Sequence, residues 1–141
     1  MKKFILLSLF ALLPFAASIS TSQVNTPPLS PEETEVVKPF QSLVNGWYKQ
    51  DLELYMSAYH EKAEIETTTR RKISKDTLRK VVKLEGNISC IIEIEKIQIK
   101  GNIANVNCTV KTGDQVVPMI YNLIKETDGH WFIIRRQIRQ N

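Results

Sequence analysis

The sequence predicts an α+β fold: a cone in which three N-terminal helices pack against a curved, mainly antiparallel sheet. Helix caps and helical apolar spacing dominate residues 30–85, and long strand-like runs fill residues 88–139. The curvature is predicted by a change of apolar parity between Ile94 and Ile97. One extra residue near Glu95 must form a bulge there, which bends the strand.

The N-terminus is typical of a secretory signal peptide. Lys2 and Lys3 precede an apolar run over residues 4–17, and small residues surround its end. The run is too short for a membrane-spanning helix, which needs about 20 residues. We therefore expect cleavage near Ser18 or Ser20, export to the periplasm or the medium, and no membrane insertion afterwards.

The chain divides into a signal peptide over residues 1–20, a flexible leader over residues 21–29 and one domain over residues 30–141. The leader is polar and contains two prolines, as mobile termini often do. Loss of Lys2 and Lys3 with the signal peptide lowers the formal net charge from +4 to +2. About 120 residues remain, which suffice for one hydrophobic core without a stabilising disulfide or metal ion.

The first helix has a clear start signal. Ser30 supplies an N-cap hydroxyl, Pro31 suits the first helical turn, and Glu33 completes a capping box. Apolar side chains then share one face at helical spacing: Val36, Val37, Phe40, Leu43, Val44 and Trp47. Pro39 lies within this pattern, and because it lacks an N–H donor we expect a kink or a break there.

A second, short helix is expected over residues 52–60, capped by Asp51. Residues 63–69 are rich in Thr and predict a strand, which returns as a short strand over residues 70–74. A third helix, over residues 75–85, starts at the N-cap Ser74 and stops at Gly86. Its core-facing residues are expected to be Leu78, Val81 and Val82.

Four long strands complete the domain. The first two form a hairpin that turns at Gly101 and Asn102. The return strand carries the apolar, inward residues Ala104, Val106, Cys108 and Val110. The last two strands cover residues 115–126 and 130–139 and turn around Asp128 and Gly129.

The last two strands are apolar on both faces, which is typical of strands that are covered on both sides. Three short helices can cover only one face of the sheet. We therefore expect the other face to meet a second subunit, so that the protein is a homodimer through its sheet.

The two cysteines of an exported protein first suggest a disulfide. Counting from the turn, however, Cys108 lies opposite Ile94 or Glu95, and Cys90 lies four or five residues further along. At about 3.3 Å per residue this offset is at least ~13 Å, which is beyond the reach of a disulfide. We expect two buried free thiols.

Charge is unevenly distributed along the chain. Residues 31–66 have a net charge of −5, and residues 67–83 have a net charge of +6. The basic stretch from Arg70 to Lys83 is either an anion or nucleic-acid patch or a solvated helix face. Because it contains no aromatic residue for base stacking, we favour the solvated face and expect no nucleic-acid partner.

Three stretches carry a resemblance to a known family: FQSLVNGWYKQDLELYMSAYHEKAEI, IEIEKIQIKGNIANV and YNLIKETDGHWFII. Together they resemble the nuclear transport factor 2-like superfamily, which includes the ketosteroid isomerases and polyketide-cyclase-like proteins. The resemblance implies a cone-shaped fold with a cavity, frequent dimers, and functions that range from isomerisation and hydrolysis to binding. A fold alone does not choose among these functions.

The isomerases of the family use a carboxylate base, a phenol and a protonated acid in the cavity. No position of this sequence matches either family acid, and the expected inward strand residues include no carboxylate. The candidate catalytic groups are therefore His60, Glu66 and Tyr59. His60 is either a general base or a solvated helix cap, whereas Glu66, with Glu64, faces either the cavity or solvent.

A ligand pocket has its own candidates. The candidates are five aromatic residues and one cation: Trp47, Tyr55, Tyr59, Tyr121, Trp131 and Arg135. The alternative is that the aromatic residues only pack in the core and that Arg135 lies at the rim. Arg135 has the strand parity of Trp131 and is a candidate hook for an acidic ligand. His60 and His130 have no third ligand at a recognisable spacing, so we expect no metal and no cofactor.

The sequence thus favours an exported, non-enzymatic domain that binds a small apolar or amphipathic molecule. One alternative is an isomerase, dehydratase or hydrolase that uses His60 or Glu66 as a base and a Tyr hydroxyl as a donor. A second alternative is a protein-interaction module that binds a different partner through its sheet.

Overall fold

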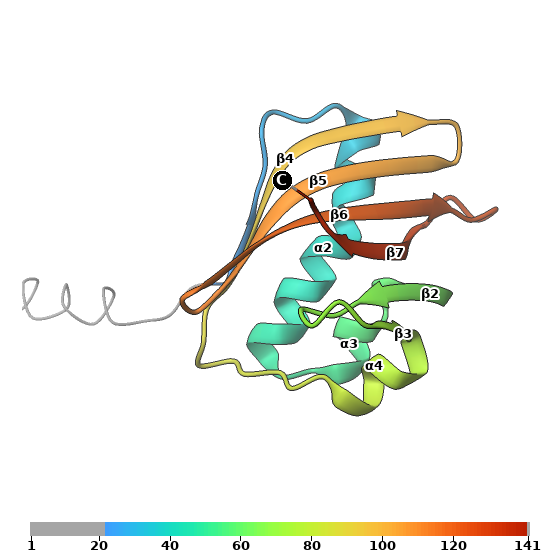
Figure 1. Ribbon diagram of the computed structural model, residues 1–141. Coiled ribbons are helices and arrows are strands. Elements are labelled where there is room, and N and C mark those ends of the chain that lie inside the picture. The colour runs from blue at the N-terminus through green and yellow to red at the C-terminus, as the bar shows by residue number, and fades with distance from the viewer. Residues whose placement is uncertain (1–21, 141) are drawn as a thin grey trace, which may run out of the picture.

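The computed structural model describes residues 22–140 and has an α+β architecture (Figure 1). Its helices are α2 (Pro31–Lys49), α3 (Leu52–Met56) and α4 (Lys75–Val81). Its strands are β1 (Gln23–Asn25), β2 (Tyr59–Glu66), β3 (Lys72–Ser74), β4 (Cys90–Lys100), β5 (Ile103–Thr112), β6 (Gln115–Lys125) and β7 (Trp131–Ile138). The predicted signal peptide lies outside the described residues. No helix within residues 22–140 is long and apolar enough to cross a membrane.

The strands form one sheet in the order β1-β4-β5-β6-β7-β2-β3. Strands β4 to β7 pair antiparallel, whereas β1 joins β4 and β2 joins β7 in parallel. Figure 1 shows the long strands curving across helix α2, which contacts β1, β4 and β7. The predicted curved, mainly antiparallel sheet is confirmed, and it extends beyond β4 to β7 by β1 at one edge and by β2 and β3 at the other.

The long hairpin has the predicted register. Lys100 pairs with Ile103 across the turn, where Gly101 adopts a positive φ of 62°. The pairing shifts by one residue between Ile94 and Lys96, which confirms the predicted bulge.

The cysteines also lie as predicted. Cys108 pairs with Ile94 on β4, four residues beyond Cys90. Both thiols are free and buried, so each packs as a small apolar group.

Helix α2 begins as predicted. The Ser30 hydroxyl accepts a hydrogen bond from the Glu33 N–H at 3.2 Å, and the Glu33 carboxylate accepts one from the Ser30 N–H at 2.9 Å. The helix then continues past Pro39 to Lys49, so the expectation of a break is wrong. Side chains on both sides of Pro39 are fully buried, including Phe40, and this packing outweighs one missing backbone hydrogen bond.

Helix α3 ends four residues earlier than predicted, because strand β2 begins at Tyr59. There Tyr59 pairs with Ile133 of β7, and the Ala58 carbonyl accepts a hydrogen bond from the Ile133 N–H at 2.8 Å. Sheet pairing thus overrides the helical spacing. His60 is therefore a strand residue, and its predicted role as a helix cap is wrong.

Helix α4 is also shorter than predicted and ends at Val81, well before Gly86. Ser74 caps it and Leu78 is buried, as expected. Val81 is 58% exposed, however, so its predicted place in the core is wrong. Val82 is already extended, a conformation that β-branched residues favour.

The expected flexible leader contains an ordered segment. Val24 pairs with Ile92 in the parallel β1–β4 ladder, and the Ser22 hydroxyl accepts a hydrogen bond from the Cys90 N–H at 3.0 Å. The sequence does not reveal this strand, because the strand is short and polar and forms by pairing with the edge of β4.

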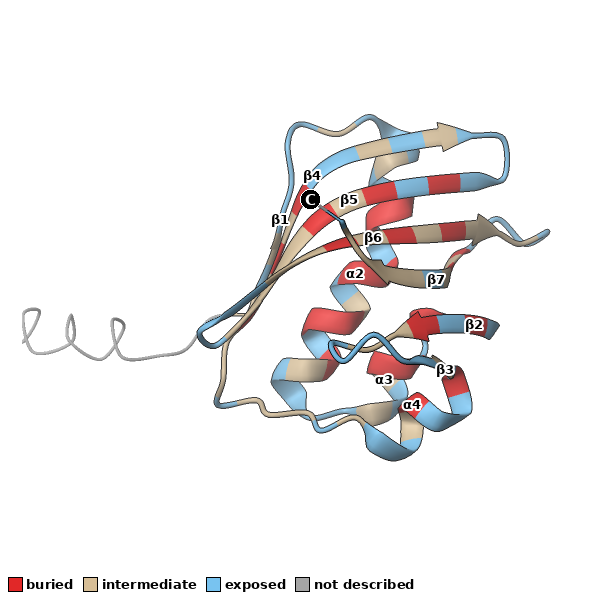
Figure 2. Cartoon of the chain, in the orientation of Figure 1, coloured by how far each residue is buried: buried red, intermediate tan, exposed pale blue. Residues whose placement is uncertain are grey.

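The core lies between helix α2 and the sheet. Figure 2 shows buried positions along one side of α2 and at alternate positions of β5 and β6. The side chains that are completely enclosed include Val36, Phe40, Ile65, Val106, Leu123 and Ile133. Val106, with Ala104 and Cys108, confirms the predicted inward face of β5.

Gly46 lies where helices α2 and α3 pack closely together. A Cβ atom at this position would lie 2.6 Å from the Tyr55 backbone nitrogen and 2.8 Å from its Cα. Gly46→Ala is therefore expected to lower the free energy of unfolding by roughly 1–3 kcal/mol, measured by urea denaturation. Asn45→Ala, at the exposed neighbouring position, is the control and should not destabilise the protein. A stabilised Gly46→Ala protein would contradict the close packing.

Candidate functional site

A cavity of about 240 Å³ opens between helix α2 and the sheet. Its apolar wall includes Leu43, Trp47, Tyr55, Ile92, Met119 and Tyr121. Its polar groups are Glu66, Thr68, Thr112, Gln115 and Arg136. Apolar walls with a few polar groups are the usual composition of a small-molecule site.

Arg136 is the cation of this cavity. Its Nη1 donates a hydrogen bond to the Tyr59 hydroxyl, and its Nη2 donates one to the Glu66 backbone carbonyl, both at 3.3 Å. Its Nε is enclosed and has no hydrogen-bond partner within residues 22–140. Burial alone would lower the pKa of Arg136, but the oxygens of Tyr59, Tyr121 and Tyr55 outweigh burial and raise it. The guanidinium is therefore charged at every physiological pH.

A bulge in β7 brings Arg136 to this position. Asn122 of β6 pairs with Arg135, but the next residue, Leu123, pairs with Ile133, so Ile134 is an extra residue. The bulge reverses the side-chain alternation after Ile133. Arg135, the predicted hook, is consequently exposed and lies outside the cavity, which Arg136 lines instead.

The phenols near Arg136 are neutral hydrogen-bonding groups. Burial raises the pKa of Tyr55 and that of Tyr121 well above the usual value, although the positive charge of Arg136 acts in the opposite direction. Tyr59 is 1% exposed and does not line the cavity, but its hydroxyl accepts a hydrogen bond from Arg136, which does. Trp47 lines the cavity, and its indole N–H donates to the Ile88 carbonyl at 2.7 Å.

Trp131 lies elsewhere, although the sequence placed it among the pocket residues. It is 5% exposed and borders a separate depression with Pro39, Ala58 and Phe132. The Lys125 ammonium lies 5.5 Å from its ring centroid. Trp131 is thus a core residue at the opposite end of strand β7.

Glu66 is the one candidate acid that lines the cavity. Its carboxylate accepts a hydrogen bond from the Ile138 N–H at 2.7 Å, and its second oxygen lies 3.9 Å from Arg70. Glu64 is exposed and lies 3.9 Å from both Lys72 and Arg135. The two acids therefore do not enter the cavity together.

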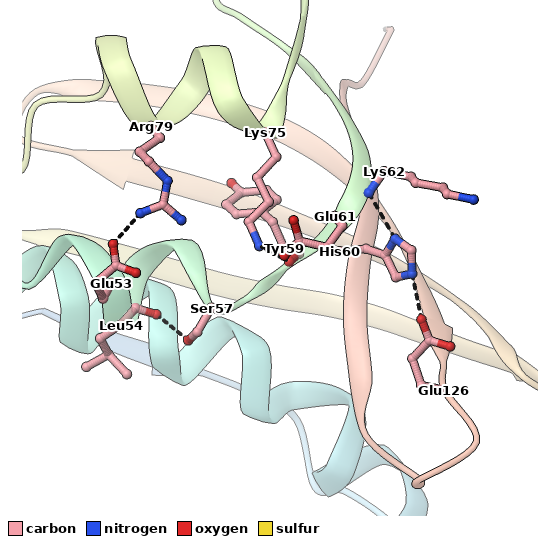
Figure 3. A network of polar contacts seen from close by, with 10 residues as sticks. All are labelled: Glu53, Leu54, Ser57, Tyr59, His60, Glu61, Lys62, Lys75, Arg79 and Glu126. Carbon is pink, nitrogen blue, oxygen red and sulfur yellow. Dashed lines mark hydrogen bonds and ion pairs between the residues drawn. The ribbon is translucent and has the colours of Figure 1, made fainter.

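His60 lies outside the cavity. Its Nε2 is 2.6 Å from the Glu126 carboxylate, and its Nδ1 accepts a hydrogen bond from the Lys62 N–H at 3.0 Å. Both ring nitrogens therefore have partners. Figure 3 shows this pair to one side of a second contact, in which Lys75 reaches from helix α4 toward β2.

Lys75 is the buried charge that joins α4 to the sheet. It is 7% exposed, and its Nζ lies 2.9 Å from the Tyr59 carbonyl and 2.9 Å from the Glu61 carboxylate. The hydrogen bond from Lys75 and its charge lower the pKa of Glu61. This network holds Tyr59, and through it the Arg136 contact, in place.

Metal ligands do not gather in this structure. Within residues 22–140, no group of three or more His, Cys, Asp or Glu side chains is placed to hold a metal ion.

No family model matches the chain, and no curated protein is similar enough to be matched. Solved structures are similar. A nuclear transport factor 2-like protein of unknown function from Shewanella baltica OS155 is 16% identical and gives a TM-score of 0.57, covering 81% of this chain and 100% of its own.

Two further similar structures bear the names of enzymes. A Shewanella frigidimarina NCIMB 400 protein named for the ketosteroid isomerases is 15% identical, with a TM-score of 0.61 over 77% of this chain and 98% of its own. A Novosphingobium aromaticivorans DSM 12444 protein named for scytalone dehydratase is 18% identical, with a TM-score of 0.60 over 78% of this chain and 84% of its own. At these identities the likeness shows the fold alone.

The two thiols are expected to be unreactive in the folded protein. Burial raises the pKa of Cys90 to about 11 and that of Cys108 to about 12. At pH 8 only about one Cys90 thiol in a thousand is then ionised, and the thiolate is the reactive form. Ellman's reagent should label both thiols in urea and neither within minutes in buffer. Rapid labelling of the native protein would contradict the described burial.

Proposed function

On this nuclear transport factor 2-like fold, we propose that the protein binds a small amphipathic molecule. The observation that carries the proposal is the cavity of about 240 Å³, in which apolar walls enclose a few hydrogen-bonding groups. This space equals about eight water molecules at ~30 Å³ each. The ligand is therefore small.

Binding is favoured over catalysis by the positions of the candidate bases. His60 is outside the cavity, in contact with Glu126. Glu66 lines the cavity, but its carboxylate already accepts the Ile138 N–H, and no tyrosine hydroxyl bonds to it within residues 22–140. A base without a paired donor offers no clear route for proton transfer.

The proposal includes export. The charged start, apolar run and small residues of the first twenty positions support removal of a signal peptide and action in the periplasm or the medium. A protein of this kind would meet its ligand outside the cytoplasm.

The proposal also includes a homodimer formed through the sheet. Ile103, Ile124 and Phe132 are direct neighbours across β5, β6 and β7. Ile103 is 54% exposed, and the other two are half-buried. Such an apolar row on the outer face of the sheet favours association with a second copy.

Val117 and Val116 offer a matched test of ligand binding, because Val117 lines the cavity and Val116 is 59% exposed beside it. Val117→Phe fills the cavity, so saturable binding of phenylacetamide and phenylacetate should be lost. Val116→Phe adds the same atoms outside and should bind both probes as the wild type does. The readout is the change in amide chemical shifts during NMR titration.

Two outcomes would contradict the binding proposal. In the first, neither probe gives saturable shifts with the wild-type protein. In the second, Val117→Phe binds the probes as well as Val116→Phe does. In either case the cavity is not a binding site for small aromatic molecules.

Ile124→Lys tests the homodimer. A charge in the centre of the apolar row should convert a dimer into a monomer, because its burial at the interface is costly. Native mass spectrometry measures the change and also reports any retained small molecule. Val81→Lys, on the exposed surface of α4, is the control and should remain dimeric. A monomeric wild-type protein would contradict the homodimer.

A further inference from the structure

We propose that the ligand is a monocarboxylate, and that the Arg136 guanidinium binds its carboxylate inside the cavity. This inference rests on the proposed function and specifies its ligand. It starts from the incomplete bonding of Arg136, a partly buried cation whose Nε is enclosed.

Arg136 lacks a counter-ion. It forms no ion pair with any carboxylate of residues 22–140, and the acids of the adjoining strand have other partners. Glu66 accepts from the Ile138 N–H and lies near Arg70, whereas Glu64 lies near Arg135 and Lys72. A charge that is removed from water is costly unless it is paired, so an anion in the cavity would stabilise this arrangement.

The guanidinium also has unused donors. Within residues 22–140, only two of its five N–H groups donate hydrogen bonds, both 3.3 Å long and both to uncharged oxygens. Its Nε–H has no partner in this part of the chain, although the atom is enclosed. A planar guanidinium matches the two oxygens of a carboxylate in a bidentate pair, and such charge-assisted bonds are shorter and stronger.

The surroundings favour a single negative charge on the ligand. Thr112 and Gln115, which also line the cavity, are neutral, and Glu66 contributes a carboxylate of its own. A dianion such as phosphate would meet one cation and one acid. A monocarboxylate with an apolar body instead places its charge at Arg136 and its body against Leu43, Tyr55 and Ile92.

The test compares phenylacetate with its uncharged isostere phenylacetamide, by NMR titration of the purified protein. The carboxylate should bind about ten- to one-hundred-fold more tightly, the usual gain from hydrogen bonds between charged partners. Arg136→Met should reduce phenylacetate affinity to that of the amide. Arg135→Met removes the same charge from the exposed neighbouring residue and should leave both affinities unchanged.

The outcomes separate this inference from the proposed function. Equal affinities for acid and amide in the wild-type protein would overturn the carboxylate assignment while the binding function stands. No saturable binding of either would overturn both. Inorganic phosphate that binds as tightly as phenylacetate would overturn the monocarboxylate assignment. The comparison of acid and amide in the wild-type protein needs no variant, so it tests the carboxylate assignment even if Arg136→Met does not fold.

Discussion

The cavity and the side chains that face it depend on where the sheet bends. An extra residue at Glu95 in β4 and another at Ile134 in β7 interrupt ladders that would otherwise be regular. A bulge increases strand twist and bends the strand, so these two positions help to curl the sheet around helix α2. The second bulge has an additional effect, because it reverses the alternation of the last strand. Without it, Arg135 would face the cavity and Arg136 would face away.

The curved sheet then places a partly buried charge beside apolar side chains. Arg136 lies among tyrosines whose pKa values burial keeps high, and its hydrogen bonds are long and incomplete. Lys75 provides a contrast, because it is more deeply buried and contacts both a carbonyl and the Glu61 carboxylate at 2.9 Å. Within residues 22–140, Lys75 has a carboxylate partner and Arg136 has none. This difference links the packing of the domain to the ligand that we propose.

Much of the fold could be predicted from the sequence. In a strand that is covered on one face, apolar and polar residues alternate, and turn residues mark where the strand ends. The bulge in β4 is visible because Ile94 and Ile97 differ in parity. The bulge in β7 has no such signal, since Trp131, Phe132, Ile133 and Ile134 are apolar at both parities. Prediction therefore chose Arg135 instead of Arg136. Trp47, Tyr55, Tyr121 and Glu66 line the cavity. Tyr59 and His60 lie outside its lining, because helix α3 ends where sheet pairing begins, and local sequence does not encode that pairing. Trp131, at the start of β7, also lies outside it.

The central claim is that a partly buried arginine with unused hydrogen-bond donors defines the ligand. A crystal structure of the protein grown with phenylacetate tests it most directly. The account predicts the carboxylate within hydrogen-bonding distance of the Arg136 guanidinium, with the aromatic ring between Leu43, Tyr55 and Ile92. A ring in the cavity with its carboxylate turned toward solvent, or an Arg136 side chain paired with Glu66, would contradict it.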